Sequence, residues 1–73
     1  MATVFAKMID AGVAVGVAEA IPHGLGATPD VYFLTNDCGP NITESATPPD
    51  AVNCYVANGG AGVELATVVA ILQ

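Results

Sequence analysis

The sequence predicts an all-β fold, a small antiparallel β-sandwich or partly open barrel of about five to six strands. Valine recurs at every second position from residue 13 to residue 17, which matches the two-residue period of a strand. Short apolar runs are separated by glycine, proline, asparagine and aspartate, which are typical turn residues. A chain of 73 residues provides one hydrophobic core at most, so residues 1–73 are expected to form a single domain.

The first half of the chain is expected to form three strands. Residues 3–9 are compatible with a strand, and residues 10–12 (Asp-Ala-Gly) with a turn. Alanines make a helix a competitor for residues 13–18, but alternating valines and two nearby glycines favour a strand. Residues 23–30 form a compact loop whose glycines can adopt a positive φ. Residues 31–35 are rich in aromatic and branched side chains and predict the third strand.

The second half is expected to contain a long loop and a terminal hairpin. Residues 36–50 are polar and rich in proline, which predicts an excursion over the surface. Residues 51–57 and 63–72 are the last two predicted strands. The Asn58-Gly59 pair lies between them, and Asn-Gly between apolar runs is a strong hairpin signal.

The charge balance argues against nucleic acid and anionic lipid as partners. Lys7 is the only lysine or arginine, against seven acids, which gives a net charge of −6. Binding to phosphates needs clustered cations, which this chain lacks. The apolar stretches at residues 11–18 and 65–72 are too short to span a membrane as helices. No signal-peptide pattern opens the sequence, so synthesis in the cytoplasm is expected.

The composition predicts permanent association with other subunits. Hydrophobic residues make up 53% of the chain and charged residues 11%, whereas a soluble domain usually carries about 25% charged residues. So small a domain would leave apolar surface in water, and such patches usually mark partner contacts. Small side chains near residue 16 and apolar ones near the C-terminus are the expected partner surface. Its predicted members are Ala14, Gly16, Ala18, Val68, Ala70 and Leu72.

The residue types that carry catalysis are few, and no enzymatic activity is predicted. Ser45 lacks the Gly-x-Ser-x-Gly elbow that presents a nucleophile. Cys38 or Cys54 could pair with His23, but a chain with one cation offers little to stabilise a thiolate. Without a secretion signal, the two cysteines are expected to remain reduced.

No cofactor or metal site is predicted. Three soft donors without a Cys-x-x-Cys pair do not suit structural zinc. A calcium site is a weak alternative in the polar loop, where oxygen donors cluster without the order of an EF-hand. These donors are ordinary loop residues. They are Asn36, Asp37, Asn41 and Glu44.

His23 opens the glycine-rich loop, directly after Ile21-Pro22. A lone histidine in such a place more often braces a turn through hydrogen bonds to backbone groups than binds a ligand. We therefore interpret it as a structural residue.

Residues 21–31, with the sequence IPHGLGATPDV, resemble a pattern in small β modules of tailed-phage virion proteins. In those modules a strand runs into a His-x-Leu-Gly turn, and a proline shortly afterwards starts the next strand. The modules include capsid decoration (cement) proteins and parts of tail fibres. The resemblance implies a structural turn formed by His23, Gly24, Leu25, Gly26 and Pro29.

The resemblance also implies a function. A free-standing chain of this size is most similar to a capsid decoration protein, which implies a homotrimer on the major capsid protein and a location in the virion. A tail or tail-fibre module for host attachment is the alternative. A small cytosolic enzyme or inhibitor is a further alternative from a different class.

Overall fold

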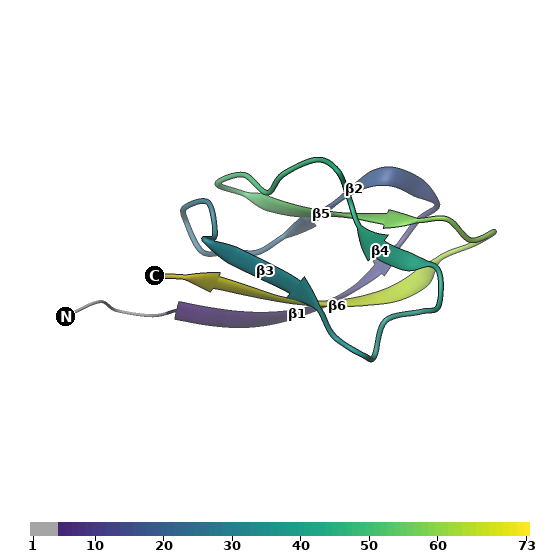
Figure 1. The fold of residues 1–73 in the computed structure, drawn as a ribbon, viewed down its shortest axis with the longest axis horizontal. Helices are drawn as coiled ribbons and strands as arrows, with labels where there is room; N and C mark the ends of the chain where they lie inside the picture. The colour runs from purple at the N-terminus through teal and green to yellow at the C-terminus, as the bar shows by residue number, and fades with distance from the viewer. Residues whose placement is uncertain (1–4) are drawn as a thin grey trace.

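A computed structural model describes residues 5–73, and it confirms the all-β prediction. The described chain forms six strands in two antiparallel three-stranded sheets and no helix, consistent with a small β-sandwich (Figure 1). Accordingly, residues 5–73 offer no helix long and apolar enough to cross a membrane. The strands are β1 (Phe5–Val13), β2 (Gly16–Pro22), β3 (Val31–Leu34), β4 (Ile42–Glu44), β5 (Asn53–Asn58) and β6 (Glu64–Leu72).

The chain alternates between two layers. Sheet A has the strand order β1-β6-β3, and sheet B has the order β2-β5-β4. Figure 1 shows sheet B above sheet A, with β6 and β5 as the middle strands. In sheet A, Val69 of β6 lies between Met8 of β1 and Phe33 of β3. Residues that face each other across antiparallel strands point to the same side, so these three share one face.

The core lies between the two sheets and is built from small and medium side chains. Alternate residues of β5 and β6 point into it, which follows from the two-residue period of strands. Complete burial of a valine or isoleucine stabilises the fold by about 1.5 to 3 kcal/mol. The buried apolar residues are Val13, Ile21, Ile42, Cys54, Val56, Ala66, Val68 and Ala70.

The predicted turn at residues 10–12 is wrong, because β1 continues through it. Asp10, Ala11 and Gly12 pair in unbroken register with β6. The side-chain oxygen of Asp10 also accepts a 2.8 Å hydrogen bond from Thr67 Oγ1. Pairing along β6 therefore overrides the local turn preference of Asp-Ala-Gly. Residues 3 and 4 of the first predicted strand lie outside the described residues.

The strand predicted at residues 13–18 is divided between two sheets. Val13 ends β1, the chain crosses at residues 14–15, and β2 begins at Gly16 with an irregular register before Glu19. The alternating valines do lie in or beside strands, but the run crosses from one sheet to the other. A short crossing of this kind places β1 and β2 in facing layers.

The predicted hairpin through Asn58-Gly59 is also wrong, because β5 and β6 belong to different sheets. The favoured Asn-Gly hairpin turn needs a positive φ at both central residues, and neither has one here. Asn58 is instead buried, with an exposed fraction of 1%. Its amide nitrogen donates 2.9 Å hydrogen bonds to the carbonyls of Val13 and Gly62, and its oxygen accepts one from Gly60 N. These bonds hold the crossing from sheet B to sheet A.

The loop predicted at residues 36–50 contains one strand that the sequence did not predict. Ile42–Glu44 forms β4 and pairs with the end of β5. Ile42 is 8% exposed and belongs to the core. Three residues are too few to display an alternating pattern, so this strand can be identified only from its pairing with β5.

Candidate functional site

The His23 turn follows directly after β2. The imidazole is 1% exposed, and both of its nitrogens are used. Nδ1 lies 3.1 Å from the backbone N–H of Leu25 and accepts its hydrogen bond. Nε2 therefore carries the ring proton and donates it to the carbonyl oxygen of Asp50, at 2.8 Å. The backbone N–H of His23 also donates to the carbonyl of Val52, at 3.0 Å. The ring thus joins its own loop to the loop that precedes β5.

Asp50 organises the second of these loops. Its Oδ1 accepts hydrogen bonds from the backbone N–H groups of Val52 and Asn53, at 2.9 and 2.7 Å. Its Oδ2 accepts a 2.6 Å hydrogen bond from the Tyr55 hydroxyl. The hydroxyl bond and then the two backbone bonds hold the pKa of Asp50 below its ordinary value. The same hydroxyl bond raises the pKa of Tyr55.

The other residues predicted to form the turn lie together with His23. Gly24 and Gly26 have φ values of 67° and 78°, in the left-handed region that favours glycine. Leu25 packs against the core, and Pro29 is buried. The arrangement suits a braced turn, since each polar atom of the imidazole is occupied by the backbone of this chain.

The candidate nucleophiles all make contacts with other parts of the chain. Ser45 Oγ donates a 2.6 Å hydrogen bond to the carbonyl of Val17 and accepts one from Thr47 N. Cys54 is completely buried, and burial, followed by the charge of Asp50, raises the pKa of its thiol. Cys38 is half-buried with its Sγ against the backbone of Thr67. Both cysteines are free thiols.

The acidic side chains are spread over the molecule. Within residues 5–73, no three His, Cys, Asp or Glu side chains gather closely enough to hold a metal ion. Of the oxygen donors weighed for calcium, Asn41 is hydrogen-bonded to Glu64 of β6 through both its backbone and its side chain. These bonds connect the polar loop to sheet A.

The predicted partner surface needs a correction. Val68 and Ala70 are 0% exposed, because their face of β6 points into the core against sheet B. Leu72 lies on that same inward face and is half-buried. Ala14 and Ala18 are exposed and Gly16 is half-buried, at the opposite end of the sandwich. The sequence prediction chose the wrong side of β6, since both of its sides are apolar.

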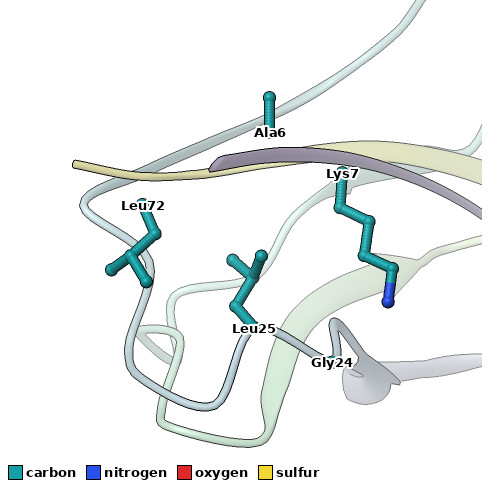
Figure 2. A pocket seen from close by; sticks show the side chains of 5 residues that line it. All are labelled: Ala6, Lys7, Gly24, Leu25 and Leu72. Atoms are coloured by element: carbon teal, nitrogen blue, oxygen red, sulfur yellow. The ribbon is translucent and has the colours of Figure 1, made fainter. Parts of the chain in front are cut away.

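A pocket of about 400 Å³ lies where Leu72 leaves the core (Figure 2). Ala6, Lys7, Gly24 and Leu25 complete its lining. Figure 2 shows Leu72 and Leu25 reaching toward each other across it, and the Lys7 amine extending toward the Gly24 backbone. The pocket therefore separates the His23 turn from the paired ends of β1 and β6.

The opposite side of sheet A is an apolar surface. We name Ala6, Met8, Val31, Phe33, Val69 and Ile71 the outer patch; they form two cross-strand rows, Ala6–Ile71–Val31 and Met8–Val69–Phe33. Met8 is 67% exposed, Val31 50% and Phe33 45%. Val69 and Ile71 are half-buried between their neighbours. Residues 65, 69 and 71 give this face of β6 an apolar alternation in the sequence, but residues 66, 68 and 70 make the other face equally apolar, so the sequence does not distinguish the two.

Comparisons of the chain with protein-family models, with curated proteins and with solved structures find no match.

Proposed function

We propose that this chain is a structural subunit of a virion, a capsid decoration protein that acts as a homotrimer. The trimer binds the major capsid protein on the outer surface of the shell and stabilises the junctions between capsomers. Its action is mechanical, because added buried area between neighbouring capsid proteins helps the shell resist the pressure of packaged DNA. The resemblance of residues 21–31 to tailed-phage β modules is the source of this assignment.

The observation that supports the proposal best is the exposed outer patch on so small a β-sandwich. Phe33 and Met8 keep 45% and 67% of their surface in water. Apolar surface of this kind usually marks a protein contact. The hydrogen bonds of His23 and Ser45 are made to backbone groups of this chain, which suits a structural subunit.

Copy number in purified particles tests the proposal. We expect the chain to be present in many copies, in a constant ratio to the major capsid protein, when particle proteins are quantified by mass spectrometry. Particles that lack it should release DNA at a lower temperature, and adding the purified chain should restore the release temperature. Absence of the chain from particles would overturn the proposal.

The same measurement decides the alternative within the virion. The modules that residues 21–31 resemble also occur in tail fibres, and a chain located there would serve host attachment. A few copies per particle, located at the tail by electron microscopy, would replace the decoration role with the tail role.

A further inference from the structure

Three large apolar side chains of the described residues lie outside the core. The fully buried apolar residues are isoleucine, valine, alanine and cysteine. Met8, Phe33 and Leu65 are 67%, 45% and 47% exposed, all on the outward side of sheet A. Burial of such side chains stabilises a protein by roughly 1.5 to 3 kcal/mol each, and the folded monomer realises only part of this. A second protein surface is needed to realise the rest.

The outer patch is contiguous and uncharged. Its two cross-strand rows lie side by side at one end of sheet A. The next row begins with Asp10, whose carboxylate accepts the 2.8 Å hydrogen bond from Thr67 Oγ1. Asp10 therefore marks the rim of the patch. A carboxylate at a rim remains hydrated, whereas at the centre of an interface its desolvation would cost several kcal/mol.

The area of the patch suits an interface between copies. The exposed fractions of Met8, Val31 and Phe33 alone correspond to roughly 300 Å² of surface in each copy, so the three patches of a trimer together approach the ~1,000 Å² at which specific interfaces begin. The chain carries a net charge of −6, yet none of its acids lies within the patch. The patch therefore offers no negative charge that could pair with the cations of a basic partner. Another copy meets it with an equally uncharged, apolar surface while the acids stay in water.

We infer that the outer patch is the surface through which copies of this chain bind one another. The inference deepens the proposed function, on which it rests for the number of copies, since it assigns the contact that holds the homotrimer together. The contact residues are therefore the outward-facing Met8 and Phe33, and not Val68 and Ala70, which the sequence predicted but which face inward.

Sedimentation velocity across a micromolar concentration series tests the inference on the full chain. Wild type should associate. Met8→Lys and Phe33→Lys should each weaken association about tenfold or more, because a charge then lies among apolar side chains at the contact. Val63→Lys is the matched control, since Val63 is 72% exposed but lies before β6, outside the patch. It should associate like wild type.

Thermal unfolding of the same variants separates lost association from lost folding. Substitutions at exposed positions should leave the folded monomer intact, and the milder Phe33→Ala should weaken association in the same direction. A monomeric wild type, or a Val63→Lys variant that dissociates as much as Phe33→Lys, would overturn the inference.

The outcomes also distinguish the inference from the proposed function. If the wild-type chain is a dimer and Phe33→Lys dissociates it, the inference about the outer patch holds and the proposed trimer is wrong. A trimer unaffected by Met8→Lys and Phe33→Lys overturns the inference and leaves the decoration role standing. Copy number in particles tests that role independently.

Discussion

At His23, the imidazole connects two loops that are far apart in the sequence. One nitrogen accepts from Leu25 N, and the other donates to the carbonyl of Asp50 across 27 residues of chain. The buried ring holds the two loops together, since both of its nitrogens have hydrogen-bond partners within the chain. Its loss would leave two backbone groups near the core without a hydrogen bond, and such groups are costly.

Replacing His23 with Ala should lower the free energy of unfolding by about 1 to 3 kcal/mol, the usual range for a stranded buried partner. Urea unfolding followed by circular dichroism measures this change. His23→Asn is the control, because its Oδ1 can still accept from Leu25 N and the loss should be smaller. Particle binding should weaken only in proportion to stability. Unchanged stability with lost binding would make His23 a contact residue instead.

Gly26 isolates the effect of backbone conformation. No atom lies within 4 Å of the place where a Cβ would stand, so its φ of 78° alone opposes substitution. Gly26→Val should destabilise the fold by at least about 1 to 2 kcal/mol, the usual cost of a left-handed conformation for residues with a Cβ. Gly62→Val is the control, because Gly62 has equal space and no positive φ. Equal melting temperatures for the two variants would contradict this account.

The pKa of Asp50 gives a prediction about acid. It is lower in the folded chain than the ordinary value of 3.8, so the carboxylate stabilises the fold above that value. This contribution is lost as the pH falls from 3.8 through the lowered pKa of the folded chain. Tyr55→Phe removes the largest cause and should move the pKa of Asp50 back toward 3.8. The stabilisation then disappears at a higher pH.

Carbon-13 titration of the Asp50 carboxyl group by NMR measures this shift. Tyr32→Phe is the control, since the Tyr32 hydroxyl donates to the carbonyl of Tyr55, 3.3 Å away, and makes no bond to Asp50. A pKa of Asp50 that is the same in wild type and Tyr55→Phe would show that the hydroxyl bond has no electrostatic effect.

Among the elements, the crossing from β5 to β6 depends on the buried amide of Asn58. Its two donated bonds fasten the end of β1 and residue 62 to the end of β5. The crossing thus joins the two sheets through one side chain. A leucine at this position would suit the core in volume but would leave the carbonyl of Val13 without this bond.

Asn58→Asp should therefore destabilise the sandwich more than Asn58→Ala. The carboxylate keeps an acceptor for Gly60 N but faces the carbonyl oxygens of Val13 and Gly62 without a proton to donate. Differential scanning calorimetry of both variants measures the order. Because an aspartic acid regains a donor when protonated, lowering the pH toward 4 should narrow the difference, and a constant difference would contradict the mechanism.

For the whole molecule, Cys54 reports on the integrity of the sandwich. It is completely buried between the sheets, whereas Cys38 is half-buried in a loop. Burial and the raised pKa of the Cys54 thiol both slow its reaction with alkylating reagents. Native-state alkylation resolved by mass spectrometry should modify Cys38 first. Modification of Cys54 should follow global opening and accelerate with urea, and equal native rates would contradict a closed core.

Much of this arrangement could be predicted from local patterns. The strands at residues 31–34, 53–58 and 64–72 lie within two residues of their predicted bounds, because period-two alternation and turn residues act locally. The positive φ values in the His23 loop follow from glycine, which tolerates them. β4 was missed because three residues display no period.

The sequence by itself determined the β class, the positions of most strands and the glycine turn after His23, since each depends on neighbouring residues. Only the tertiary structure decided which strands pair and which side of β6 faces inward. Both sides of residues 63–72 are apolar, so the pattern is symmetric. Packing of sheet B against the face that carries Val68 and Ala70 broke that symmetry, because contacts between residues distant in the sequence determine which face is covered.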